Sequence, residues 1–189
     1  MSIRFARLAV LAFLILPLPV IASAAAGAKP DWAQRMAGRW QGEGARIEIS
    51  TGAQTLVEVG VVSQWHPELP LPALVSKNHF KETVLDVDGN PVSSRQYDRI
   101  YWVRENSRQG ARAELLLGSG TDSSGPIASR GSYDLQSFIM IVQQDLGSGT
   151  RIHSQSDMSN PGMTVYNEMI WLNGRKKTQS EIRYQLQTP

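Results

Sequence analysis

Tyr97, Arg99 and Tyr101 alternate along a segment with strand-like composition, and this spacing places all three side chains on one face. A guanidinium group between two phenol rings can pair with an anionic head group while the rings line a cavity. On the inner side of a barrel, the three side chains would therefore form part of a ligand site. On the outer side, they would be an ordinary exposed face. The sequence leaves both interpretations open.

Other candidate ligand contacts lie in separate segments. Trp65 and His66 end a strand-like run directly before the Pro-rich sequence 67–72, which places them at the rim of a barrel. His66 could gate an entrance there, or it could be a solvated loop residue. Met140 and Met169 lie in runs rich in apolar residues, and methionine suits an adaptable apolar pocket. The same runs would also serve as plain core.

Motifs for metal or nucleophilic chemistry do not occur. The chain has no Cys, and its three His residues show neither His-x-His nor His-x₃-His spacing. A zinc site needs three or four converging ligands, and the nucleophile elbow of a serine hydrolase needs Gly-x-Ser-x-Gly. We expect no metal and no cofactor, and we favour a non-catalytic role. An isomerase, hydratase or cyclase with one acid or base in an apolar cavity stays an alternative, because it would leave no short motif.

The first residues have the three parts of a cleavable signal peptide. Arg4 and Arg7 precede an apolar run over 8–22, and small residues follow. This run is broken by prolines and is shorter than the about 20 residues that span a bilayer, which favours cleavage over an uncleaved anchor. We predict a signal peptide over 1–26 and export by general secretion. The mature domain, 27–189, would then be periplasmic or secreted, with no membrane span.

The mature domain is expected to carry no net charge. The whole chain has 19 Lys and Arg against 17 Asp and Glu, and the signal peptide contains two of the arginines. A neutral domain has no global field that would attract nucleic acid or acidic membranes. Without Cys it has no disulfides, so a hydrophobic core must stabilise it. We expect no nucleic-acid partner.

The mature sequence predicts one short helix followed only by strands. The helix is expected over 30–38. Strand-like runs follow, separated by turn sequences such as Asp88-Gly89-Asn90-Pro91 and the hairpin-favouring pair Asn173-Gly174. The predicted strands cover 39–49, 55–65, 73–85, 92–104, 111–118, 127–134, 136–144, 150–158, 163–172 and 176–187.

This pattern favours an all-β fold, a single up-and-down antiparallel barrel of about 8–10 strands, over a β-sandwich. Nearly all links are short enough to be hairpins. The run 150–158 is polar on one face and has Ser154 and Ser156 on the other, and a dry sandwich core would bury these serines. The interior of a barrel can hold a ligand and water, so it tolerates them.

The short helix followed by Gly38-Arg39-Trp40 and Gly42-Glu43-Gly44 resembles the calycin superfamily, which includes lipocalins, fatty-acid-binding proteins and nitrobindin-like barrels. In lipocalins, Gly-x-Trp lies on the first strand and an Arg of the last strand packs over the Trp. Gly38, Trp40 and Arg183 occupy the corresponding places. The resemblance implies a barrel that encloses a small apolar or amphipathic ligand.

Two properties of the superfamily do not carry over. Nitrobindin-like proteins bind haem through a His near the C-terminus, and this sequence has no His after His153. The Arg-x-Tyr pair of fatty-acid-binding proteins is missing from the last strand, because Arg183 and Tyr184 are adjacent and point to opposite faces. We therefore expect a lipocalin-like barrel for a small, largely apolar ligand. A filled barrel that acts as an envelope accessory or interaction protein is a further alternative.

Overall fold

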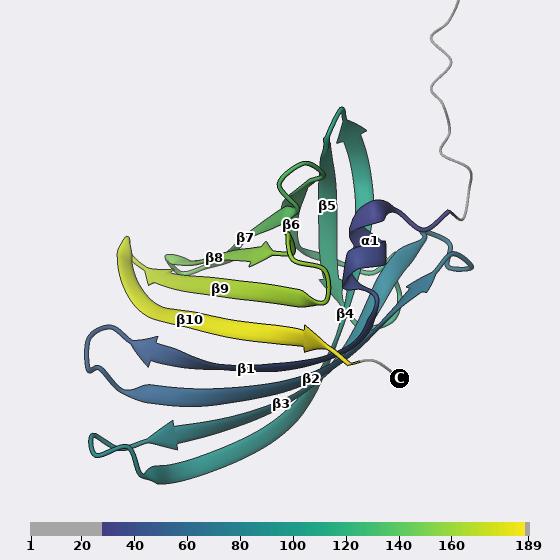
Figure 1. The fold of residues 1–189 in the computed structure, drawn as a ribbon. Helices are drawn as coiled ribbons and strands as arrows, with labels where there is room; N and C mark the ends of the chain where they lie inside the picture. The colour runs from purple at the N-terminus through teal and green to yellow at the C-terminus, as the bar shows by residue number, and fades with distance from the viewer. Residues whose placement is uncertain (1–27, 188–189) are drawn as a thin grey trace, which may run out of the picture.

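One short helix and ten strands make up the structure, a computed structural model that describes residues 28–187 (Figure 1). The predicted signal peptide, 1–26, lies outside the described residues. Within residues 28–187, no helix is long and apolar enough to cross a bilayer. The elements are α1 (Asp31–Met36), β1 (Gly38–Glu48), β2 (Gln54–His66), β3 (Ala73–Leu85), β4 (Pro91–Gln109), β5 (Arg112–Ser119), β6 (Ile127–Asp134), β7 (Ile139–Gly147), β8 (Thr150–Asp157), β9 (Met163–Leu172) and β10 (Arg175–Leu186).

The strands form a closed antiparallel barrel in up-and-down order. Each strand pairs with its neighbours in the chain, and β10 pairs with β1 to close the ring. Asn173 and Gly174 both have positive φ in a tight turn between β9 and β10, which is the conformation that this residue pair favours. The predicted fold class and the predicted N-terminal helix are confirmed. One predicted turn, 105–110, is wrong: β4 continues through it to Gln109 with a bulge after Glu105.

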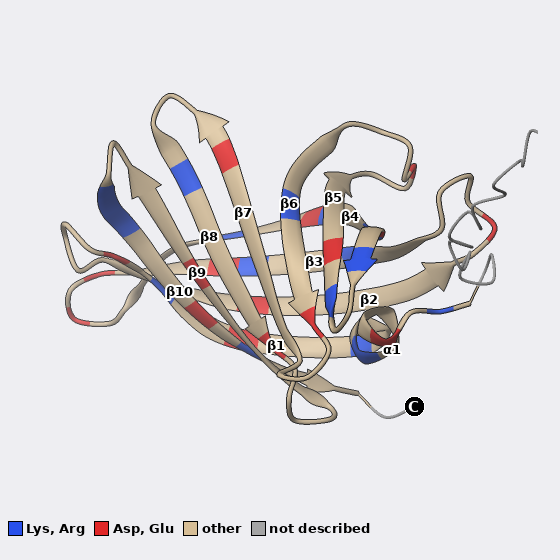
Figure 2. Ribbon diagram, turned by 90° about the horizontal axis from the view of Figure 1, so that it is seen from above, with Lys and Arg blue, Asp and Glu red and all other residues tan. Residues whose placement is uncertain are grey.

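The two ends of the barrel differ. The β1–β2, β3–β4 and β9–β10 hairpins project at the left of Figure 1, on the side away from α1. Helix α1 lies against the opposite side, which is the plugged end. Viewed from above, acidic and basic residues are interspersed over the strands (Figure 2).

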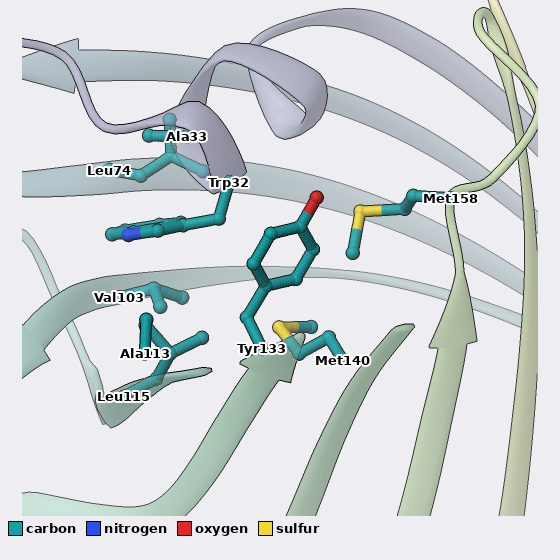
Figure 3. Close-up of a cluster of buried hydrophobic side chains, with 9 residues drawn as sticks. All are labelled: Trp32, Ala33, Leu74, Val103, Ala113, Leu115, Tyr133, Met140 and Met158. Atoms are coloured by element: carbon teal, nitrogen blue, oxygen red, sulfur yellow. The ribbon is translucent and has the colours of Figure 1, made fainter. Parts of the chain in front are cut away.

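The main core lies at the plugged end and is built around Trp32 of α1 (Figure 3). The Trp32 side chain is fully buried, and its indole N–H donates a hydrogen bond to the Glu105 carboxylate over 2.9 Å. The buried residues packed with Trp32 are Ala33, Leu74, Val103, Ala113, Leu115, Tyr133, Met140 and Met158. Because α1 buries Trp32 and Ala33 in this core and leaves Asp31 exposed, the helix covers this end of the barrel.

The Gly42-Glu43-Gly44 sequence allows β1 to approach β10 closely. A Cβ atom on Gly44 would lie 1.9 Å from the carbonyl oxygen of Glu181, and one on Gly42 would lie 2.6 Å from the Tyr184 ring. Neither glycine has a positive φ, so the requirement is space rather than backbone conformation. These glycines let the ladder that closes the barrel form at this spacing.

Candidate ligand-binding cavity

A cavity of about 540 Å³ lies between the strands of the barrel, and all ten strands contribute to its lining. This volume is within the range of small-molecule sites. Towards α1, apolar side chains line the cavity, among them Trp40, Val103, Met140 and Met158. Elsewhere the wall is mixed, with arginine, tyrosine and serine side chains between aliphatic ones. An amphipathic molecule matches this lining better than a wholly apolar one.

The stripe Tyr97, Arg99 and Tyr101 of β4 faces the cavity. Arg99 Nη1 donates to the Tyr101 hydroxyl over 3.2 Å, and the Arg99 guanidinium lies 5.1 Å from the centroid of the Tyr97 ring. Trp102 alternates with these residues and is buried in a separate cluster that includes Val75. Of the two sequence interpretations, the structure therefore supports the inward-facing one.

Glu82 of β3 is a buried carboxylate, 3% exposed, beside this stripe. It accepts hydrogen bonds from Arg46 Nη1 over 3.1 Å, from Arg95 Nε over 2.8 Å and from the Tyr97 hydroxyl over 2.8 Å. Burial opposes the charge of Glu82, but the bonds from Arg95 and Tyr97 and the charge of Arg46 outweigh it. The pKa of the Glu82 carboxyl is consequently lowered from its ordinary value. Sequence reasoning missed Glu82, although its alternation with Phe80 was visible.

We expect Glu82→Gln to lower the free energy of unfolding at neutral pH by about 1–3 kcal/mol, because Arg46 and Arg95 lose their shared anion. The folded-state pKa of Glu82 lies below the unfolded-state value, so its charge stabilises the protein above that ordinary value. This contribution is lost as the pH falls through the lowered pKa, so wild type and variant should converge in acid. Urea unfolding at several pH values measures this.

Glu58→Gln is the control for this prediction. Glu58 pairs with Lys81 over 2.6 Å, but both side chains are largely exposed, so its removal should cost less than about 1 kcal/mol. An equal loss in the two variants, or a Glu82→Gln effect that persists in acid, would contradict the role given to Glu82.

The wall formed by β9 and β10 carries a second polar group. Tyr166 donates its hydroxyl proton to Glu168 Oε2 over 2.8 Å, and both residues line the cavity with Tyr184. Burial, and next the negative charge of Glu168, raises the pKa of Tyr166 well above its usual value, and the same two causes raise the pKa of Tyr184. Both phenols stay protonated at physiological pH and can donate hydrogen bonds. None of the three residues was singled out as a ligand contact from the sequence.

The remaining predicted ligand contacts are divided between the cavity and other places. Met140 lines the cavity, whereas Trp65, His66 and Met169 do not. Trp65 packs edge-on against Trp32 with ring centroids 6.0 Å apart. His66 Nδ1 lies 2.6 Å from a Glu68 carboxylate oxygen at the end of β2.

Met169 does not line the cavity, because side chains alternate between the two faces of β9. Its neighbour Glu168 points into the cavity, so Met169 points away from it. As for metals, no three His, Asp or Glu side chains converge as ligands within residues 28–187.

The lipocalin-like pattern is reproduced only on the first strand. Gly38 begins β1, and Trp40 lines the cavity and donates its indole N–H to the Met36 carbonyl oxygen over 3.0 Å, which ties β1 to the end of α1. The expectation that Arg183 packs over Trp40 is wrong. Arg183 lies between the inward-facing Ile182 and Tyr184, so its side chain points outward, is 72% exposed and pairs with Glu181.

The fold and the cavity together define a closed, ten-stranded antiparallel β-barrel with an interior cavity of small-molecule size. Among solved structures, the S-type phycobiliprotein lyase CPES from Guillardia theta is similar, with a TM-score of 0.55 and 11% sequence identity. The match covers 84% of this chain and 92% of the lyase chain. No protein-family model and no curated protein matches the sequence. At this identity the likeness shows a common fold alone.

Proposed function

We propose that this protein is an exported, lipocalin-like barrel that binds a small amphipathic molecule and does not catalyse a reaction. The observation that carries the proposal is the cavity of about 540 Å³ with an apolar region beside α1 and polar groups elsewhere. Export is proposed from the sequence of residues 1–26, which predicts a periplasmic or secreted protein.

Three observations support a bound small molecule. The cavity argues against the filled-barrel alternative, because side chains leave space for a ligand. A ligand that covers apolar side chains such as Val57, Leu117 and Ile182 would gain about 25 cal/mol of binding free energy for each Å² of apolar surface removed from water. The likeness to a phycobiliprotein lyase is consistent with a small-molecule ligand such as a bilin.

Two related dyes test the proposal. N-phenyl-1-naphthylamine is apolar, and 1-anilinonaphthalene-8-sulfonate adds an anionic group to the same ring system. We expect both dyes to bind the folded protein in a 1:1 ratio with a rise in fluorescence. The sulfonate should bind more tightly, because the Arg99 guanidinium faces the cavity.

A pair of variants on β8 shows whether the dyes occupy the cavity. Ser156 is buried and lines the cavity, so Ser156→Trp should fill it and weaken binding of both dyes by at least about tenfold. Gln155 is the preceding residue and points to the outer face, so Gln155→Trp should bind like wild type. Circular dichroism confirms that both variants fold. No binding by wild type, or equal binding by both variants, would overturn the proposal.

A further inference from the structure

Three charged residues line the cavity, Arg46, Arg99 and Glu168, and the last two face it from opposite sides of the barrel. Arg99 lies on β4 and Glu168 on β9, and both line the same cavity. In the closed order of ten strands, β9 is five strands from β4 in either direction. The two side chains therefore approach the interior from opposing walls.

Arg99 forms no ion pair with a carboxylate in the described part of the chain. Its guanidinium donates to the Tyr101 hydroxyl and lies over the Tyr97 ring, and no Asp or Glu among residues 28–187 lies within 4.0 Å of it. Arg95 of the same strand points elsewhere and pairs with the buried Glu82 carboxylate, which also accepts from Arg46 of β1. Arg99 therefore presents a guanidinium without a paired carboxylate to the cavity.

Glu168 has no basic partner in the described part of the chain. The hydrogen bond that it accepts comes from the neutral Tyr166 hydroxyl. Arg46 is the nearest arginine by strand register, since Arg46 pairs with Ser180 and Ser180 pairs with Glu168. The Arg46 guanidinium donates to Ser180 Oγ over 3.4 Å and pairs with Glu82 over 3.1 Å, and it forms no ion pair with Glu168. Glu168 therefore presents an uncompensated carboxylate to the cavity.

We propose that the ligand carries an anionic group that pairs with Arg99 and a protonated or N–H-donating nitrogen that pairs with Glu168, with an apolar body between them. A charge that is removed from water must be paired or hydrogen-bonded. A ligand with one group would leave the other protein charge unpaired when it displaces water from the cavity. A zwitterionic or amphoteric ligand can pair with both Arg99 and Glu168. This inference rests on the proposed function and adds the chemical class of the ligand.

Matched aliphatic compounds test this class. Dodecanoic acid carries only the anion, dodecylamine only the cation, and 12-aminododecanoic acid both. Shorter ω-amino acids of six to ten carbons are included, because they vary the separation of the two charges. Each compound competes with bound N-phenyl-1-naphthylamine. We expect one ω-amino acid to displace the dye at a concentration at least about tenfold below both single-charge compounds of the same length.

Variants of Arg99 and Glu168 show which residue pairs with each charged group of the ligand. Glu168→Gln should bring the best ω-amino acid to the affinity of the matching fatty acid, and Arg99→Gln should bring it to that of the matching amine. Glu181→Gln is the control, because Glu181 is on the outer face of β10 and its loss should leave the competition unchanged. Dye binding by each variant confirms that the cavity is intact.

The outcomes separate the two proposals. If wild type binds no dye, the proposed function fails and this inference fails with it. If wild type binds the dye but no ω-amino acid exceeds the single-charge compounds, the zwitterionic class is wrong and the binding function stands. The zwitterionic class is equally wrong if Glu168→Gln competes like wild type.

Discussion

Gly44→Ala should lower the free energy of unfolding by about 3 kcal/mol or more, a large effect for one added methyl group. The new Cβ would lie 1.9 Å from the carbonyl oxygen of Glu181 and 2.7 Å from the Cα atom of Ile182. These are main-chain atoms of the paired strand, so they cannot rotate away as a side chain would. β1 and β10 must therefore separate at the ladder that closes the barrel.

Gly60→Ala is the matched control. Gly60 is also inside a strand, but its Cβ would have only ordinary contact, 3.8 Å from Gln41 Oε1. This substitution should change stability by less than about 1 kcal/mol. Urea unfolding followed by tryptophan fluorescence measures both variants. If the two variants lose similar amounts of unfolding free energy, the close approach of β1 to β10 is not the reason for a glycine at position 44.

Trp32→Ala should cost about 3–5 kcal/mol, because a fully buried aromatic side chain is removed from the main core and leaves a cavity. Without this anchor, α1 should detach from the plugged end more readily. Limited proteolysis should then cut within residues 28–37 faster than in wild type, and urea unfolding measures the stability loss. If the Trp32→Ala variant keeps the stability and the protease resistance of wild type, Trp32 does not hold α1 against this end of the barrel.

Trp32→Phe separates the packing of the ring from its hydrogen bond. Phenylalanine keeps most of the apolar contact but cannot donate to the Glu105 carboxylate over 2.9 Å. The expected cost is about 1–3 kcal/mol, since Glu105 Oε2 loses one of its two donors and keeps only Arg108 Nη2, over 2.9 Å. If the Phe and Ala variants unfold at the same urea concentration, the hydrogen bond rather than the packing anchors the helix.

Sequence reasoning was sufficient for the architecture because its signals are local. The turn at Asn173-Gly174 is determined by residues that tolerate positive φ, and strand composition indicated ten strands. It placed 105–110 in a turn because that segment is polar. Pairing of Glu105 to Gln109 with β5 outweighs this polarity, and β4 extends accordingly.

The site was harder to predict because its residues meet only after closure. In β9 every residue after Met163 is partly buried, so alternation does not reveal the inward face, and Met169 was chosen where Glu168 lines the cavity. The contacts of Glu82 come from Arg46 on β1 and Arg95 on β4, and their approach depends on strand register. The expectation for Arg183 was wrong for a related reason. The lipocalin pattern places an Arg on the last strand, but it does not determine which face of the strand that Arg occupies.

The pairing of β1 with β10 also has a consequence for how the chain folds. Every other ladder joins strands that are consecutive in the sequence, so those hairpins can form early. The closing ladder brings together segments at the two ends of the domain, Gly38–Glu48 and Arg175–Leu186, and such a contact forms slowly. In a chain made from its N-terminus, β1 keeps one unpaired edge until β10 arrives. During that interval, pairing with another copy competes with folding.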